Sequence, residues 1–245
     1  MNSLIRLLGA CVTVFLFAPT ASAGPWVPPE GTSYLQAGGT FLRASDRDEF
    51  RLNLYGEFGI ADRLAVIASV PFTYSNTTGQ APSGDTLDDF VGLAPSAGLR
   101  YGLVQGRFVL ALQGDLSLPV NGGSVNLTGQ ILAGGSLDRR GRSFAQVGAG
   151  VRARSGSDAH EFIGNADVGV WLGSPVLVIA EYRARRQFTT EREATVEENE
   201  HMVGGQLIFK LTDKVLLGTE VLYTIPNNSV AEAVTSTLYI AVNRN

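Results

Sequence analysis

The sequence predicts an all-β protein, a closed antiparallel transmembrane β-barrel of about 12 strands. Apolar and polar residues alternate over long segments, and tight turns alternate with longer polar loops. The chain is 44% hydrophobic, yet no apolar run after its N-terminal leader approaches the ~18 residues of a spanning helix. A backbone in hydrocarbon must pair its N–H and C=O groups internally, so an all-β chain spans a membrane only as a closed barrel.

Residues 1–23 predict a secretory signal peptide, which leaves residues 24–245 as the outer-membrane β-barrel domain. Arg6 supplies the positive n-region, an apolar h-region follows, and Ala-Ser-Ala ending at Ala23 is a small-residue cleavage site. The alternatives are an N-terminal membrane helix and lipidation at Cys11. The apolar run is short and the cysteine comes early, which favours cleavage after Ala23. Cys11 is the single cysteine, so the mature chain has no disulfide framework.

Residues 50–74 show the repeating unit most clearly, as two long strands around a tight turn at residues 61–63. Apolar residues or glycine occupy every second position from Leu52 to Ile60, and the positions between them are mostly polar. Period-2 alternation over about ten residues on each side of a short turn predicts a β-hairpin. Crossing a bilayer takes strands of ~9–11 residues, whereas soluble strands usually have about five or six.

The alternation recurs along the whole chain and gives twelve predicted strands. The first six are residues 32–45, 50–60, 64–74, 89–103, 107–119 and 125–137. In the fourth, Leu99 and Tyr101 flank Arg100, and in the fifth, Leu112 and Leu116 lie on the face opposite Asp115. Such segments fit a wall with lipid on one side and a polar interior on the other.

The second half of the chain repeats the pattern with more charge on the polar face. Its six predicted strands are residues 143–154, 161–172, 176–188, 203–211, 215–224 and 235–242. In the eighth strand Val168 and Val170 alternate with Asp167, and in the ninth Val178 and Tyr182 lie opposite Glu181. The even number of strands brings both ends of the barrel domain to the same side of the membrane.

The connections alternate in length, as they do in outer-membrane barrels. Tight turns are predicted at residues 61–63, 104–106, 139–141, 173–175 and 212–214, and longer polar loops at 75–88, 189–200 and 225–234. We expect the tight turns and both termini on the periplasmic side, with the longer loops outside the cell. A secreted soluble β-sandwich is the alternative, but its turns recur every ~8–12 residues, against a period of about 18 residues here.

The charge balance excludes one class of partner. Without Arg6 the chain has 18 basic and 23 acidic residues, and nucleic-acid binding requires a basic face. The sequence predicts no cofactor and no metal, because two histidines and no ligand spacing do not describe a metal site. The glutamates of residues 191–200 form an acidic loop, which is read as a solvated loop with divalent-cation binding as the alternative.

Three stretches resemble a known family. They are Gly24-Pro-Trp-Val-Pro-Pro-Glu-Gly31, Tyr55-Gly-Glu-Phe-Gly-Ile-Ala-Asp-Arg-Leu64, and Asp88-Asp-Phe-Val-Gly-Leu93 followed by Gly98-Leu-Arg-Tyr101. They resemble the outer-membrane barrels called meta-pathway phenol-degradation proteins, over most of the mature chain. The resemblance implies a transporter-like protein of the Gram-negative outer membrane, with lipid, the barrel assembly machinery and an unidentified small-molecule solute as partners. Residues 239–245 depart from it, because outer-membrane barrels usually end on an aromatic residue that the assembly machinery reads.

Charged residues on the inward parity are the candidate lumen-lining residues. They are Arg51, Glu57, Arg100, Asp115, Arg152, Arg154, Glu161, Asp167, Glu181, Arg183, Arg185, Lys210 and Glu220. An open path lined by these arginines favours anions. Mutually paired charges instead form a plug, because isolated buried charges are costly. Barrels of ~8 strands are filled by side chains and those of ~16–18 hold a water channel, so twelve strands leave both alternatives open.

The predicted function is passive transport of small molecules across the outer membrane, without enzymatic activity. The alternatives are a structural or adhesive barrel that does not conduct, and a lipid-modifying hydrolase on the outer barrel face. The hydrolase would need His160 or His201 with a serine such as Ser155, Ser157 or Ser229. No nucleophile motif accompanies these residues, so the histidines are read as surface residues.

Overall fold

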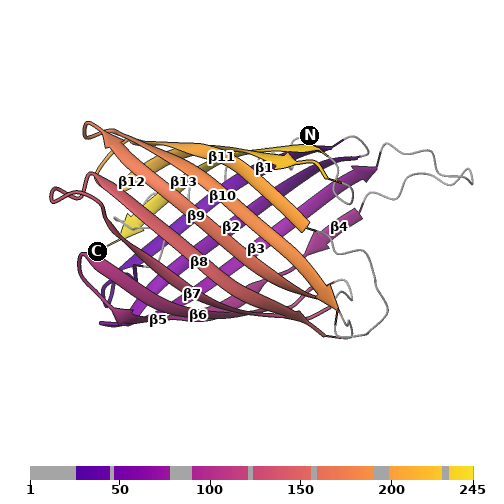
Figure 1. Ribbon diagram of the computed structural model, residues 1–245, viewed down its shortest axis with the longest axis horizontal. Helices are drawn as coiled ribbons and strands as arrows, with labels where there is room; N and C mark the ends of the chain where they lie inside the picture. The colour runs from indigo at the N-terminus through magenta and orange to yellow at the C-terminus, as the bar shows by residue number, and fades with distance from the viewer. Residues whose placement is uncertain are drawn as a thin grey trace, which may run out of the picture.

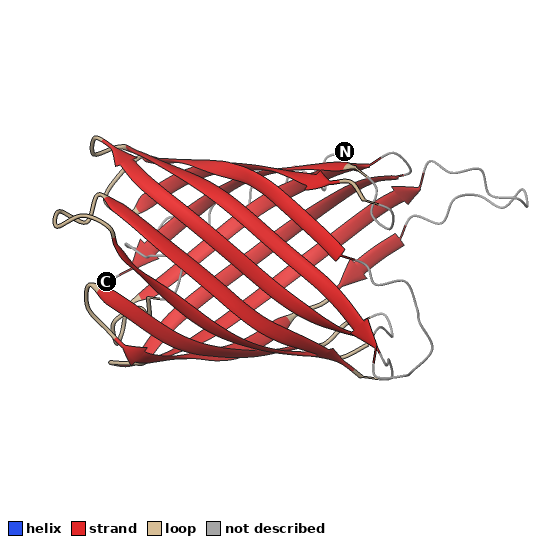
Figure 2. Ribbon diagram, viewed as in Figure 1, coloured by secondary structure: helices blue, strands red, loops and turns tan. Residues whose placement is uncertain are grey.

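The computed structural model describes residues 26–44, 47–77, 90–120, 124–155, 159–189, 199–227 and 232–244. These residues form a closed antiparallel barrel whose tilted strands are drawn in Figures 1 and 2. The predicted signal peptide and most of the predicted long loops lie outside the described residues. No helix in the described ranges is long and apolar enough to span a membrane.

The described strands run almost the full length of the barrel wall. Their bounds are β1 (Ser33–Ala44), β2 (Arg47–Ala61), β3 (Leu64–Thr77), β4 (Phe90–Leu93), β5 (Ser96–Val104), β6 (Phe108–Ser117), β7 (Asn126–Ser136), β8 (Ser143–Arg154), β9 (Ala159–Leu172), β10 (Val176–Thr189), β11 (Asn199–Lys210), β12 (Val215–Ile225) and β13 (Ala233–Arg244). Each pairs antiparallel with its neighbours, and the pairing of β1 with β13, from Ser33↔Arg244 to Ala44↔Ala233, closes the wall.

The prediction of about 12 strands is confirmed, with one interruption. Both β4 and β5 pair with β3, so they are two halves of the single strand predicted over residues 89–103. Pro95 lies in the break between them and has no N–H to give to the ladder. The wall stays continuous there, since the Pro95 carbonyl accepts a hydrogen bond from the Leu118 N–H at 2.9 Å.

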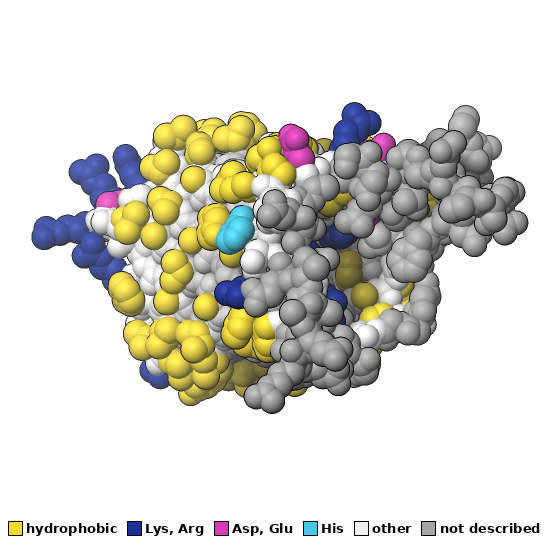
Figure 3. Space-filling view, turned by 45° about the vertical axis from the view of Figure 1, so that its right-hand side comes forward, with side chains coloured by type: hydrophobic (Ala, Val, Ile, Leu, Met, Phe, Trp, Pro, Cys, Tyr) yellow, Lys and Arg dark blue, Asp and Glu magenta, His cyan; other side chains and the backbone are white. Residues whose placement is uncertain are grey.

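The alternation along each strand sorts residues between lipid and lumen. Leu52, Leu54 and Phe58 are 45–48% exposed on the outer face, whereas Glu57, between them in sequence, is 3% exposed. Figure 3 shows apolar side chains spread over the outer wall. The lipid-facing parity predicted from the sequence is therefore found in the fold, and the polar residues lie inside.

Exposed aromatic side chains gather toward the two ends of the wall. Near the tight turns these are Phe58, Tyr101, Phe108 and Phe209, and near the longer loops they are Phe41, Phe50, Phe72, Phe162 and Tyr223. Phe162 stacks on Phe188 across β9 and β10, with ring centroids 4.4 Å apart. Two such girdles flanking an apolar band are the lipid-facing pattern of a transmembrane barrel.

The five tight turns lie at one end, on the left in Figure 1, and we call this the turn end and the opposite end the loop end. Gly141 has a φ of 66° in the β7–β8 turn, a conformation that L side chains rarely adopt. In the same turn the Asp138 carboxylate accepts hydrogen bonds from the N–H groups of Arg140 and Ser143, both at 2.6 Å. The Ser143 hydroxyl donates a further bond, and these bonds lower the pKa of Asp138 to about 2.

Candidate functional site

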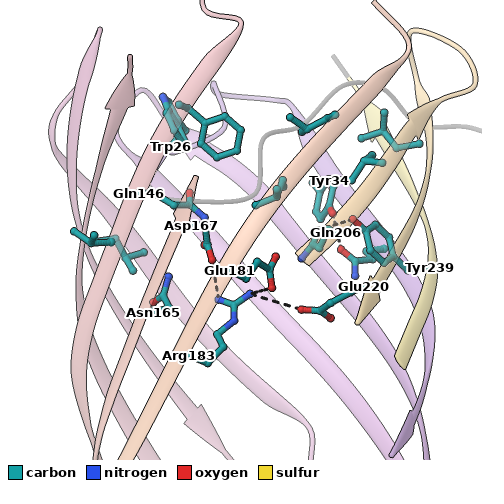
Figure 4. Close-up of a pocket in the computed structure, with 18 of the residues that line it drawn as sticks. Trp26, Tyr34, Gln146, Asn165, Asp167, Glu181, Arg183, Gln206, Glu220 and Tyr239 are labelled. Carbon is teal, nitrogen blue, oxygen red and sulfur yellow. Dashed lines mark hydrogen bonds and ion pairs between the residues drawn. The ribbon is translucent and has the colours of Figure 1, made fainter. Parts of the chain in front are cut away.

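A cavity of about 560 Å³ lies in the lumen, and Figure 4 shows the side chains that surround it. Its charged lining residues are Arg100, Asp167, Glu181, Arg183 and Glu220. Its aromatic lining residues are Trp26, Tyr34, Phe144, Trp171 and Tyr239. The cavity therefore presents charge, hydrogen-bonding groups and aromatic faces inside a wall whose outer surface is apolar.

Arg183 lies at mid-lumen among three carboxylates, and we call Asp167, Glu181 and Glu220 the acidic cluster. Arg183 Nη2 lies 3.0 Å from Glu181 Oε2, within hydrogen-bond distance. Asp167 and Glu220 are farther away, each with an oxygen 3.8 Å from a guanidinium nitrogen of Arg183. Figure 4 shows the three acids converging on this one arginine.

The strand register explains how the acidic cluster forms. Glu181 and Arg183 are two residues apart on β10, so they share the inward face, and Asp167 on β9 is the register partner of Glu181. On β11 the register partner of Glu181 is Gly204, which has no side chain to separate β10 from Glu220 on β12. Asp167 is 3% and Glu181 7% exposed, while the side chains of Glu220 and Arg183 are 17% and 32% exposed.

A second network lies nearer the turn end. The Arg100 guanidinium on β5 is 3.0 Å from the Glu57 carboxylate on β2. It also donates to the Gln113 side chain, with the shorter contact at 2.9 Å, and to the Trp26 carbonyl at 3.3 Å. The Tyr55 hydroxyl donates to Glu57 as well. Arg100 and Glu57 are buried, so this network ties three strands and the N-terminal segment together.

The N-terminal segment, residues 26–32, lies against the inner wall near the turn end. Trp26 meets Phe144 edge-on, with ring centroids 5.9 Å apart. The Gly59 N–H donates to the Thr32 carbonyl and the Gly31 N–H donates to the Gly59 carbonyl, both at 2.9 Å. A side chain at Gly59 has no room, because its Cβ would lie 2.1 Å from the Pro29 carbonyl oxygen.

The loop-side charges are also paired. Glu161, which is 0% exposed, contacts Arg152 at 2.9 Å and also contacts Arg154. Arg185 lies 2.5 Å from Glu200, and Arg51 pairs with Glu49, two residues away on β2. The arginines predicted to line the lumen thus each contact at least one carboxylate.

Two predicted lumen residues stand apart from these networks. Lys210 pairs with Asp213 of the β11–β12 turn at 2.7 Å, which places its ammonium at the turn end of the barrel. Asp115 lies on the inward parity of β6, half-buried, and makes no ion pair among the described residues. The predicted residues therefore do not form one row along the lumen but several separate clusters.

Several lumen residues are not among the candidates from the sequence, which were all charged. The alternation already places Tyr55, Gln113 and Gln146 on the inward parity, and a selection of hydrogen-bonding as well as charged side chains would have included them. Tyr34 and Tyr239 would have been found in the same way. Trp26 precedes the first strand, where no alternation indicates the direction of a side chain.

The two histidines lie near the loop end. His201 Nδ1 is 2.7 Å from the Tyr182 hydroxyl, and His160 Nδ1 accepts the Arg154 N–H at 3.4 Å. The Ser155 hydroxyl accepts the Val125 N–H, and Ser157 and Ser229 lie outside the described residues. Within the described ranges neither imidazole contacts a serine, and no group of three or more histidine or acidic side chains is arranged to hold a metal ion.

No protein-family model matches the chain, and no curated protein matches its sequence. Solved structures match its fold. They include the COG4313 outer membrane channel from Pseudomonas putida F1, with a TM-score of 0.68 and 12% identity over 91% of this chain and 99% of that chain. They also include the NanC porin, with a TM-score of 0.60 and 10% identity over 85% and 98%. The KdgM porin in complex with disordered oligogalacturonate has a TM-score of 0.59 and 8% identity over 85% and 98%. The chain therefore has the fold of outer-membrane barrels.

Proposed function

We propose that this protein is a passive channel for small molecules in the Gram-negative outer membrane. It reaches that membrane after export and removal of residues 1–23. The observation that carries the proposal is the cavity of about 560 Å³ lined by charged, amide and aromatic side chains. An apolar outer wall around a polar interior is the arrangement of barrels that admit water-soluble solutes. The channel uses no catalytic group and no cofactor, and its other partners are the surrounding lipid and the barrel assembly machinery.

The resemblance to meta-pathway phenol-degradation barrels supports the same proposal at a finer level. The stretch Tyr55–Leu64, which carries the resemblance, forms the end of β2 and the β2–β3 turn, and Glu57 in it binds Arg100. Arg100 itself belongs to the third of the matching stretches. These residues shape the turn-side part of the lumen, so the shared motif coincides with the wall of the proposed path.

Conductance across a planar bilayer tests the proposal. The refolded barrel, verified by a mobility difference between unheated and boiled samples, is expected to give discrete conductance steps. Gln130→Trp, on the inward face of β7, should lower the step size because it fills part of the lumen. Ile131→Trp, one residue away and 56% exposed to lipid, should leave the step size unchanged.

A structural barrel without conduction is the second candidate, and one observation favours it. The contacts among Glu57, Arg100 and the Trp26 carbonyl join β2, β5 and the N-terminal segment near the turn end, and such contacts stiffen a barrel and narrow its lumen. A folded wild-type protein that never conducts, together with a Gln130→Trp variant of unchanged stability, would favour the structural role over the channel.

A further inference from the structure

We propose that the acidic cluster is a binding site for a small organic cation bearing N–H groups, such as a protonated amine or diamine. The inference rests on the proposed function, because the ligand must reach mid-lumen along the channel. It reverses the expectation that inward arginines make the path favour anions. The charge of the cluster, its hydrogen-bond acceptors and the shape of the cavity each favour such a ligand.

The charge balance at mid-lumen is negative. Three carboxylates surround the single guanidinium of Arg183, and only Glu181 is within hydrogen-bond distance of it. Glu220 and Asp167 interact with it only at 3.8 Å, beyond the usual limit of a direct hydrogen bond. Three acid groups face one guanidinium, so even with one proton shared between Glu181 and Glu220, which hydrogen-bond each other, the cluster keeps one negative charge in excess. A low-dielectric wall strengthens the resulting field on a solute cation.

The site also has more acceptors than donors. Asp167 is 97% buried, and its Oδ2 accepts the Gln146 side-chain N–H at 2.6 Å. The Oδ1 atom of Asp167 and the Oε1 atom of Gln146 are buried and have no protein hydrogen-bond donor. Buried acceptors without donors are costly, so a rotation of the Asp167 or Gln146 side chain that brings one of these oxygens to a ligand N–H lowers the free energy of the site. An anion cannot supply that donor.

The cavity fits a ligand of this class. Its volume of about 560 Å³ falls in the range of small-molecule sites, which is roughly 300–1,000 Å³. Tyr34, Tyr239 and Trp26 line it along with the acids, as Figure 4 shows. Aromatic faces attract ammonium groups through the ring quadrupole, so the walls add to the preference of the carboxylates for a cation.

The other charged lumen residues that the structure describes do not form a site for an anion. Glu57 pairs with the Arg100 guanidinium, and Glu161 forms ion pairs with both Arg152 and Arg154. A guanidinium already held by a carboxylate offers little to a solute anion, whereas in the acidic cluster three carboxyl groups share the one guanidinium of Arg183.

Calorimetry on the folded barrel in detergent tests the inference without requiring conduction. The probe is 1,4-diaminobutane, with 1,4-butanediol and succinate as uncharged and anionic probes of similar length. We expect the diamine to bind and the other two to give no heat. Glu220→Gln and Asp167→Asn should each weaken diamine binding about tenfold, because each removes a charged acceptor. Asp62→Asn makes the same charge change in the β2–β3 turn, outside the cavity, and should bind like the wild type.

Two measurements separate failure of the site from failure of the channel. Absence of diamine binding by the folded wild type, or equal binding by Glu220→Gln, overturns the inference while leaving conduction intact. A barrel that binds the diamine but never conducts retains the site and refutes the proposed channel. In a conducting barrel, the reversal potential in a KCl gradient should show a preference for K⁺ that Glu220→Gln reduces, and a preference for Cl⁻ contradicts the inference. If Asp167→Asn does not fold, Glu220→Gln, whose side chain is more exposed, carries the test.

Discussion

Arg100 and Glu57 form an ion pair of 3.0 Å across β3, the strand that lies between their own strands β5 and β2. Both side chains are buried, so each neutralises a charge that water does not reach. Breaking a buried pair by removing one partner costs about 3–5 kcal/mol, whereas removing both leaves no uncompensated charge. We expect Arg100→Met to lower the free energy of unfolding by about this amount.

Denaturant unfolding of the barrel in lipid vesicles measures this effect. The double variant Arg100→Met, Glu57→Gln should lose less stability than the sum of the two single variants. Strict additivity of the two losses would show that the residues do not interact across β3.

Arg183 and Arg185 should differ in their contribution to stability, although they are two residues apart on one strand. Loss of Arg183 leaves the acidic cluster without a counter-charge, so Arg183→Ala should destabilise the barrel by about 3 kcal/mol or more. Arg185 pairs with Glu200 where the side chains are 42% and 20% exposed, and such pairs are worth about 1 kcal/mol or less. Thermal unfolding of the two variants in the same detergent compares them, and equal losses would place both arginines in similar surroundings.

Lipid-facing and inward positions should differ sharply in their tolerance of arginine. Ile131 is 56% exposed near the middle of β7, and arginine at a lipid-facing midplane site costs about 2–4 kcal/mol. Gln130, the preceding residue, faces the lumen. The folded fraction in vesicles should therefore fall for Ile131→Arg and change little for Gln130→Arg. A smaller loss of folded fraction for Ile131→Arg than for Gln130→Arg would mean that Gln130 faces lipid and Ile131 faces the lumen.

The β7–β8 turn should weaken in acid because of Asp138. Its pKa is lowered from 3.8 to about 2 by hydrogen bonds, first from the Ser143 hydroxyl and then from backbone N–H groups. A carboxyl with a lowered folded pKa stabilises the fold above its unfolded pKa and loses that contribution as pH falls through the folded value. The difference in unfolding temperature between wild type and Asp138→Asn should thus be constant above about pH 5 and shrink toward pH 2. If the difference in unfolding temperature stayed constant over the whole pH range, ionised Asp138 would not be the form that stabilises the turn.

Gly59→Ala should displace the N-terminal segment from the inner wall, because the added Cβ would lie 2.1 Å from the Pro29 carbonyl oxygen. The chain has two tryptophans, so a Trp171→Phe background isolates the fluorescence of Trp26. We expect its emission to shift to the red as its contacts with Phe144 and Arg100 are lost. Gly129→Ala is the matched control, since nothing lies within 4 Å of a Cβ there. An unshifted spectrum with Gly59→Ala would show that the segment adjusts without leaving the wall.

The strands could be predicted closely from the sequence because two solvents impose the pattern. Each wall residue faces either lipid outside or the polar lumen inside, and the alternation of apolar and polar residues indicates which of the two it faces. The strand predicted over residues 143–154 has the same bounds in the structure as β8. The break in the strand predicted over residues 89–103 was missed, although the lack of an N–H at Pro95 indicates it.

The site could be predicted only in part. The parity of a residue gives the side of the wall that its side chain faces, but not its position along the barrel axis or the residues that it contacts. That Arg183 meets Glu220, 37 residues away in sequence, depends on the stagger of β10, β11 and β12 around the barrel. Stagger is a property of the closed wall, and no single strand encodes it. The same reason explains why Asp115 and Lys210, predicted with the others, lie apart from the ion-pair networks.

The apolar outer wall has an evolutionary consequence. A soluble core selects side chains by shape, because interiors are close-packed and a change of even one methylene is felt. The outward-facing residues of this wall contact fluid hydrocarbon. Lipid chains adapt their packing to any apolar side chain, so leucine, valine and phenylalanine are interchangeable there. Substitution on this face is then limited by polarity rather than by the identity of the side chain, so barrels of one fold can share as little sequence as the 8–12% identity found with the solved channels and porins. Residues that stay fixed between such barrels should be sought on the inner face, where ion pairs such as Arg100 with Glu57 depend on particular partners.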